Sequence, residues 1–215
     1  MIELNNINKS YGDLHVLKDV SFSISKKEIL SIVGPSGAGK TTLLKIIGKL
    51  EDMDSGKIIF NGKETNNLKG LELCNFRNQK IGFVFQFHHL MPEFTVLENI
   101  CMPAFIKRNF KESKEYAYQL METLNIIDKK DSFPTNLSGG EQQRIAIARS
   151  LINKPDLVLA DEPSGNLDTE QAKIMHNLFN ILRTKYNQTF IIVTHNNDLA
   201  QLCDRTITLE NGIVS

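Results

Sequence analysis

A glycine-rich loop between an apolar run and a helix-forming run constrains this chain more than any other feature. The loop reads Gly34-Pro35-Ser36-Gly37-Ala38-Gly39-Lys40-Thr41 and fits the pattern G-x-x-x-x-G-K-[ST]. The apolar run 29–33 precedes it, and a helical stretch, 41–50, follows it. Strand, loop and helix in this order predict a P-loop, and this context disfavours the alternative of a chance glycine-rich turn.

The residue types in the loop suit the chemistry of phosphate binding. Glycines let backbone N–H groups face phosphate oxygens, because they carry no Cβ. The following helix adds the positive end of its dipole. Lys40 is expected to bind the β- and γ-phosphates and Thr41 to offer its hydroxyl to Mg²⁺. We therefore expect the loop, with Thr42 after it, to bind Mg-ATP.

Short apolar runs alternate with longer helical stretches along the chain. The predicted strands are 2–7, 20–24, 29–33, 57–60, 81–85, 157–160, 190–193 and 206–209. The predicted helices are 41–50, 111–125, 140–153 and 169–186. The almost wholly apolar strands are typical of a parallel sheet covered by helices on both faces. This alternation predicts an α/β fold, namely a P-loop NTPase core with a mostly parallel sheet.

Two further features refine the predicted domain organisation. The early strands, with a turn at Asn61-Gly62, indicate a small N-terminal antiparallel layer. Residues 87–150 contain no convincing strand and are predicted to form an inserted helical lobe. We therefore expect one domain over residues 1–215, with a nucleotide-binding core lobe made of 1–86 and 151–215.

A second motif places two carboxylates after an apolar strand. Asp161 and Glu162 follow the run 157–160. Asp161 is predicted to hold Mg²⁺ opposite Thr41, and Glu162 to polarise the attacking water. The alternative is an Asp-Glu cap before the turn at Pro163, and the presence of a P-loop in the same chain disfavours it.

A third motif begins a helix and reads Leu137-Ser138-Gly139-Gly140-Glu141. Ser138 is a suitable N-cap, and Glu141, three residues later, completes a capping box. An ordinary helix start would need no more than this. Ser-Gly-Gly at a helix N-terminus is also suited to bind phosphate. The chain then has two phosphate-binding loops, of which only one is a P-loop, and this suggests that the second loop binds the nucleotide of another chain.

These motifs together resemble the ATP-binding subunits of ABC transporters over essentially the whole chain. The shared order is the P-loop, Gln86, Leu137–Glu141, Asp161-Glu162, Asp168 and His195. The resemblance implies an ATPase that works as a dimer, with each ATP held between the P-loop of one copy and Ser138–Gly140 of the other.

The resemblance also implies roles for single residues. Tyr11 would stack on adenine, and Gln86 would contact Mg²⁺ and link the site to the helical lobe. Asp168, in the segment 164–168, would communicate across the dimer. His195 would touch the γ-phosphate. The catalytic set expected from the family is then Lys40, Gln86, Glu162 and His195.

Within the family, the segment 77–103 closely resembles that of the LolD group, the ATPases of lipoprotein-releasing systems. This implies two integral membrane permease subunits, LolC/LolE-like, docking near residues 87–94 (Phe87 to Phe94) at the cytoplasmic face of the bacterial inner membrane. The alternatives are a MacB-type export ATPase and an FtsE-like ATPase with a regulatory role in cell division. His88 and His89 lie in this segment; chemistry alone favours two solvated or capping histidines, and we expect a groove for a partner there rather than a metal site.

Composition excludes other classes. The chain carries 25 basic and 25 acidic residues, and a neutral protein without a basic stripe is a poor candidate for nucleic-acid binding. It shows neither a signal peptide nor an apolar run of the roughly 18 residues needed to cross a bilayer. We therefore expect a peripheral protein that a partner holds at the membrane.

Overall fold

The computed structural model covers residues 1–215 and describes all of them except 107–109, 166–168 and 197–199. Its larger sheet has the strand order β10-β9-β3-β8-β7-β6. The strands are β3 (Ile29–Val33), β6 (Ile81–Val84), β7 (Leu157–Asp161), β8 (Thr189–Val193), β9 (Arg205–Glu210) and β10 (Ile213–Val214). All neighbouring pairs are parallel except β10 with β9. The mostly parallel sheet of the prediction is confirmed.

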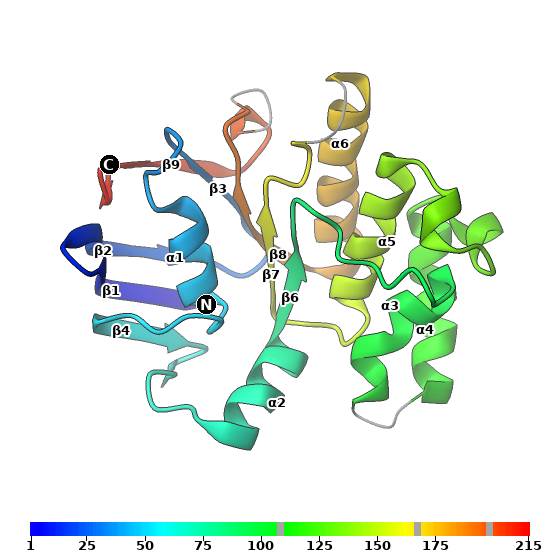
Figure 1. Ribbon diagram of the computed structural model, residues 1–215, viewed down its shortest axis with the longest axis horizontal. Helices are drawn as coiled ribbons and strands as arrows, with labels where there is room; N and C mark the ends of the chain where they lie inside the picture. The colour runs from blue at the N-terminus through cyan, green and yellow to red at the C-terminus, as the bar shows by residue number, and fades with distance from the viewer. Residues whose placement is uncertain (107–109, 166–168, 197–199) are drawn as a thin grey trace.

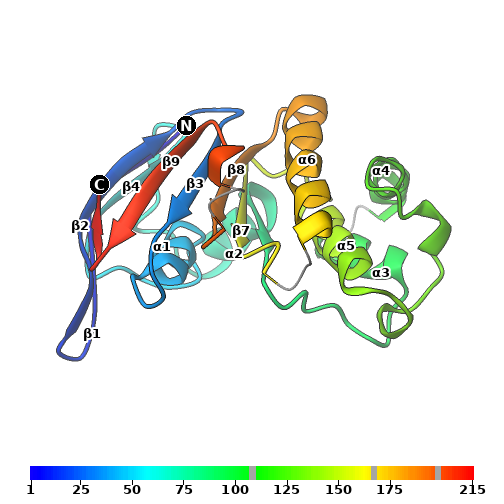
Figure 2. The same ribbon diagram turned by 90° about the horizontal axis from the view of Figure 1, so that it is seen from above.

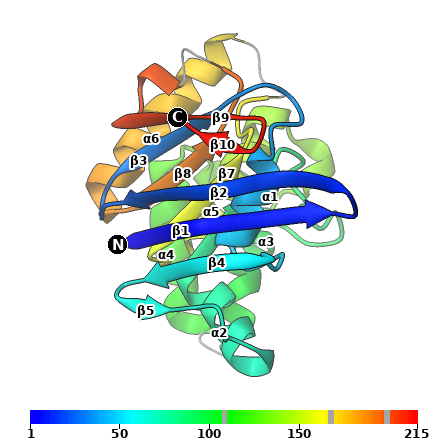
Figure 3. The same ribbon diagram turned by 90° about the vertical axis from the view of Figure 1, so that its left-hand side faces the viewer.

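A smaller antiparallel sheet lies beside the first, with the order β2-β1-β4-β5 (Figure 3). Its strands are β1 (Ile2–Tyr11), β2 (Leu14–Ile24), β4 (Ser55–Phe60) and β5 (Lys63–Glu64). Helix α1 (Lys40–Ile47) packs between the two sheets, where its apolar residues join side chains of both in one core cluster (Figure 2). This packing fixes the start of α1, and with it the glycine-rich loop, against the edge of the larger sheet.

Helices α3 (Val96–Phe105), α4 (Phe110–Thr123) and α5 (Gly139–Leu151) pack on one another at the far side of the larger sheet from β1 (Figures 1 and 2). Short 3₁₀ turns, Ile127–Lys129 and Pro134–Asn136, connect α4 to α5. Helix α6 (Thr169–Tyr186) contributes Phe179, which packs edge to face on Phe190 of β8. These helices and the sheet face form a second core cluster. None of the helices, over their described residues, is both long and apolar enough to cross a bilayer.

All eight predicted strands are found, several with longer ends than expected, and two short strands, β5 and β10, are additional. The four predicted helices are also found. Two helices were missed: α2 (Gly70–Lys80) and α3. Helix α2 has no buried residue, so it carries no apolar periodicity to detect. Helix α3 is apolar nearly all round and contains Pro103, which masks its period.

The parallel register brings the strand ends together. Asp161, the last residue of β7, pairs with Val193, the last of β8, and Val193 pairs in turn with Ile32 of β3. The carboxyl ends of β3, β7 and β8 therefore meet at one edge, which is where ligands bind in open α/β sheets.

Candidate functional site

A pocket of about 550 Å³ opens at this edge of the larger sheet. The predicted residues that line it are Tyr11, Ser36, Gly37, Gly39, Lys40, Thr41, Thr42, Gln86, Asp161, Glu162 and His195. They come from five separate stretches of the chain. Sequence reasoning missed Leu14, Val16 and Val193, which also line the pocket. The first two lie on β2 close after Tyr11, and no feature of the sequence marks them as site residues.

Lys40 lies at the start of α1, with its side chain turned back over the loop. Its Nζ donates to the carbonyl oxygens of Gly34 and Pro35, at 2.8 and 2.9 Å, and the residue is almost fully buried. A buried ammonium group that donates to neutral carbonyl oxygens keeps its charge uncompensated by them and favours an anion beside it. The loop geometry thus presents a positive charge, shielded from solvent, at the centre of the pocket.

Gly34 shows why the loop needs glycine. Its φ is +151°, and a Cβ built there would lie 2.1 Å from the carbonyl oxygen of Leu209. Gly39, with φ +98°, would place a Cβ 3.0 Å from the Val16 carbonyl oxygen. Gly34, Pro35 and Ala38 do not line the pocket themselves: Ala38 is buried in the core, and the other two hold Lys40.

Thr41 and Asp161 meet across the pocket. The Thr41 hydroxyl donates to Asp161 Oδ1 at 3.2 Å. Burial raises the pKa of the Asp161 carboxyl above its ordinary value, while the bond from Thr41 opposes that rise. A hydroxyl and a partly desolvated carboxylate are a donor set that suits Mg²⁺, which is bound through one or two carboxylates plus substrate phosphates. The two residues therefore fit the predicted metal site.

Glu162 follows β7 in a left-handed backbone conformation, with φ +47°. A non-glycine residue in this conformation is uncommon and marks a constrained position. Its N–H donates to the Val193 carbonyl oxygen at 2.9 Å, which fixes the backbone against β8. Its Oε2 lies 2.9 Å from His195 Nδ1 and accepts a bond from the His195 N–H at 3.4 Å. The Glu162 carboxylate is mostly buried, whereas the His195 ring is largely exposed.

Tyr11 lies at the rim of the pocket, 47% exposed. Its hydroxyl donates to the Glu51 carboxylate, and this bond raises the pKa of the phenol above its ordinary value. Lys9 Nζ lies 5.3 Å from the centre of its ring. The ring is thus held at its hydroxyl edge by Glu51 and remains about half exposed at the pocket rim.

The capping box predicted at Ser138 is present. Ser138 Oγ accepts from the Glu141 N–H at 3.3 Å, and Glu141 Oε2 accepts from the Ser138 N–H at 2.9 Å. Ser138 and Gly139 are exposed, and a Cβ at Gly139 would meet no atom within 4 Å. Neither they nor Gly140 line the pocket of the same chain. Asp168 lies outside the described residues.

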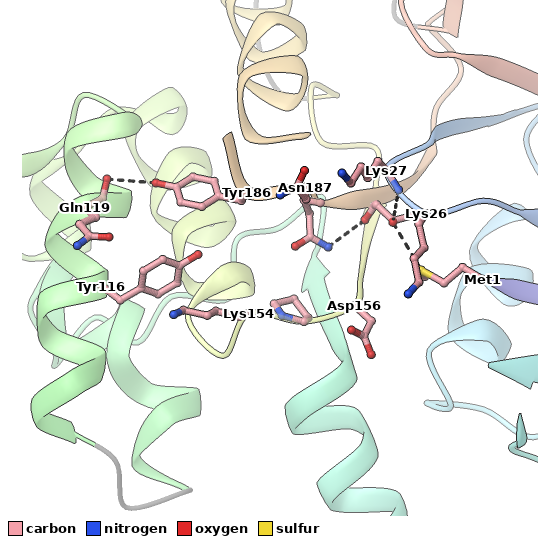
Figure 4. A pocket seen from close by; sticks show the side chains of 12 residues that line it. Met1, Lys26, Lys27, Tyr116, Gln119, Lys154, Asp156, Tyr186 and Asn187 are labelled. Carbon is pink, nitrogen blue, oxygen red and sulfur yellow. Dashed lines mark hydrogen bonds between the residues drawn. The ribbon is translucent and has the colours of Figure 1, made fainter. Parts of the chain in front are cut away.

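Two further hollows among the described residues differ from this pocket in their lining. A mainly apolar groove of about 580 Å³ runs between α2, β6 and the end of α5, with Phe85 and His89 among its lining residues. A more polar one of about 530 Å³ opens at the amino ends of β7 and β8, where Tyr116 of α4 and Tyr186 of α6 pack edge to face (Figure 4). None of the predicted site residues lines this third hollow.

Comparison with known proteins agrees with this geometry. A family model described as ABC transporter matches residues 17–165. A lipoprotein-releasing system ATP-binding protein LolD from Bacteroides thetaiotaomicron is 51% identical over 100% of this chain and 99% of its own length. The protein of the same description from Cytophaga hutchinsonii is 50% identical over 100% of this chain and 98% of its own length.

Solved structures agree in fold. The dimeric structure of MJ0796, described as a bacterial ABC transporter cassette, matches with a TM-score of 0.90 and 38% identity, covering 100% of this chain and 97% of that one. A dimeric post-hydrolysis state of MJ0796 bound to ADP and Pi matches with the same TM-score and 37% identity, over the same shares of the two chains. The chain belongs to the ABC transporter family, and within it to the ATP-hydrolysing lipoprotein-releasing system ATP-binding proteins.

Proposed function

We propose that this chain is the motor subunit of an ABC transporter that releases lipoproteins from the inner membrane toward the outer membrane. The observation that carries this proposal is full-length identity of about half with relatives named for lipoprotein release, combined with a pocket that eleven of the predicted site residues line. Two permease subunits, LolC/LolE-like, would hold the chain at the cytoplasmic face of the inner membrane.

Binding of ATP follows from the loop. Lys40 Nζ, which bonds to the Gly34 and Pro35 carbonyl oxygens, would exchange part of this contact for β- and γ-phosphate oxygens. N–H groups of the loop and the first turn of α1 would donate to the phosphates, and Tyr11 would stack on the adenine.

Three residues would hold Mg²⁺: Thr41, Asp161 and Gln86. When bound, Mg²⁺ neutralises charge that develops on the phosphate oxygens during hydrolysis. The Thr41 hydroxyl and the Asp161 carboxylate already face each other at 3.2 Å, and Gln86 lines the same pocket. The donor set therefore fits the ion.

Hydrolysis would use Glu162 as the base. The Glu162 carboxylate lies in the pocket, mostly shielded from solvent, and would accept a proton from the attacking water. The nearby His195 Nδ1 orients that carboxylate at 2.9 Å and leaves the other ring nitrogen for the γ-phosphate.

The Ser138 loop would complete the site of a second copy. Ser138 and Gly139 are exposed at the start of α5 and do not line their own chain's pocket, while MJ0796 is dimeric. ATP would bridge two copies through its γ-phosphate, and hydrolysis would remove that bridge. A ligand that binds the closed dimer more tightly than the open one shifts the equilibrium in this way.

The permeases would dock at the apolar groove and the adjoining segment 87–94. Phe87 is 67% exposed and Leu71, at the groove, is 76% exposed. Exposed apolar side chains gathered at one groove are typical of a protein interface. A short amphipathic segment of the permease would cover these side chains.

Purification from membranes tests the proposal. The epitope-tagged chain is expected to co-purify with two permeases that have large periplasmic domains. The purified complex, reconstituted in vesicles, is expected to release a lipoprotein on addition of Mg-ATP. Recovery with a MacB-type exporter, or with an FtsX-like division partner and no lipoprotein release, would contradict the assignment while leaving the ATPase intact.

A further inference from the structure

Arg149, near the end of α5, bonds to the backbone that follows Gln86. Its Nη1 donates to the His89 carbonyl oxygen at 2.7 Å, and its Nη2 donates to the His88 carbonyl oxygen at 2.6 Å. These oxygens lie two and three residues beyond Gln86. Hydrogen bonds from a charged donor are short and stronger than neutral ones, and the planar guanidinium makes two of them in one fixed orientation. The backbone at 88–89 is therefore attached to α5.

The segment takes a conformation that needs such support. His89 has φ +48°, a left-handed conformation that is costly for a residue with a side chain. Its ring packs edge to face on Phe85, with 5.3 Å between the ring centres. Gln86, which lines the ATP pocket, thus lies within the short segment 85–89, which the Phe85–His89 contact closes and the two bonds from Arg149 hold.

The other end of the segment is attached to the helices too. Asn99 of α3 is fully buried, accepts from the Met91 N–H at 2.8 Å and donates to the Met91 and Phe94 carbonyl oxygens at 3.0 Å. Arg149 and Asn99 both come from the helices that pack together beside the sheet. The path of the segment 87–94 is therefore set by these helices.

We propose that Arg149 is a positioning residue for ATP hydrolysis, which sets the place of Gln86 in the pocket and ties it to α5. Ser138 caps the amino end of the same helix, about 16 Å from Arg149 at about 1.5 Å per residue. A shift of α5 would move the Ser138 cap and the backbone after Gln86 together. This inference rests on the proposed role of Gln86.

Arg149→Lys tests this with a matched control on the same helix. Lysine keeps the positive charge but cannot make the two parallel hydrogen bonds of the planar guanidinium. Arg144→Lys makes the same change where the guanidinium donates to the Leu124 carbonyl oxygen at 3.0 Å, away from Gln86. R149K is expected to lower kcat for Mg-ATP about tenfold while KM stays within about twofold, since misplacing a catalytic group reduces turnover. R144K is expected to change neither.

A double-mutant cycle separates positioning from general loss of stability. Q86A and Q86A/R149K are expected to have the same kcat, because R149K acts through Gln86. Additive losses, or equal losses in R149K and R144K, would overturn the role of Arg149. If Q86A leaves kcat unchanged, the assigned role of Gln86 fails first. Thermal unfolding checks each variant, and R149Q, which keeps an N–H donor without the charge, replaces R149K if that variant does not fold.

Discussion

The Nδ1 of His195 lies 2.9 Å from Oε2 of Glu162, so that the residues following β8 and β7 are joined at the mouth of the ATP pocket. A backbone hydrogen bond joins the same two strand ends, since the Glu162 N–H donates to the Val193 carbonyl oxygen. The carboxylate that would activate water is therefore held from two directions. Its position depends on the parallel pairing of β7 with β8.

Replacing Glu162 by glutamine should slow hydrolysis by about 10²–10⁴-fold, the usual contribution of a general base. The amide keeps the shape of the side chain, so ATP binding and the closed dimer should persist. Single-turnover hydrolysis and size exclusion with Mg-ATP measure both properties. Turnover at the wild-type rate in E162Q would remove Glu162 from the role of base.

Replacing Asp161 by asparagine should separate stability from activity. Burial raises the folded-state pKa of the Asp161 carboxyl, so the stability that this group contributes falls as pH rises through the interval between its ordinary and raised pKa. Above this interval the carboxylate carries its charge in a partly desolvated site. D161N should therefore raise the free energy of unfolding at neutral pH and lose Mg-dependent hydrolysis.

Denaturant titrations of nucleotide-free protein test this. The gain from D161N should shrink as pH is lowered, because a protonated Asp161 no longer carries the cost of burying its charge. A D161N protein that is less stable than wild type at pH 7 would show that the bond from Thr41, not burial, dominates at this position.

Replacing Gly34 by alanine should destroy the phosphate loop. The new Cβ would lie 2.1 Å from the Leu209 carbonyl oxygen, so the loop must move and at least about 2 kcal/mol of stability is lost. Gly62→Ala is the matched control: φ is +78°, the Cβ would meet no atom within 4 Å and the residue does not line the pocket, so only about 1 kcal/mol of backbone strain applies. Calorimetry with ATP should show lost binding in G34A alone.

Replacing Leu71 by glutamate should uncouple the ATPase from the membrane. Leu71 is 76% exposed at the apolar groove and does not line the ATP pocket, so basal hydrolysis should stay within about twofold of wild type. Recovery of the permeases should fall at least about tenfold, as one buried charge costs more than 1.4 kcal/mol at an interface. Leu202→Glu, at an exposed position outside the groove, is the control. Equal recovery for both variants would place the permeases elsewhere.

Much of this architecture could be predicted from the sequence because its strands are buried on both faces. Leu157–Asp161 and Thr189–Val193 are such strands, and each is apolar except for one residue at an end, Asp161 in the first and Thr189 in the second. Helix α2 could not be predicted, since an exposed helix leaves no apolar pattern. Helix α3 could have been found by its start: Thr95 and Glu98 form a capping box.

The residues of the candidate site that belong to motifs placed after predicted strands could be predicted from the sequence. Residues that join the site through contacts between distant segments could not. Lys40, Asp161 and His195 each lie close to the end of a strand, and they line one pocket. Their roles stay predictions. Arg149 was missed, because nothing in the run around it shows that its side chain reaches the carbonyl oxygens of His88 and His89, some sixty residues away in sequence.

The most direct test asks whether Ser138 of one copy serves the ATP of the other. A variant with Ser138 and Gly139 both changed to bulky residues and the variant Lys40→Ala should each fail to hydrolyse ATP alone. Mixed, they form dimers in which one P-loop and one Ser138 loop are intact and face each other, and hydrolysis should return. Wild-type kcat in the Ser138/Gly139 variant by itself would contradict the account.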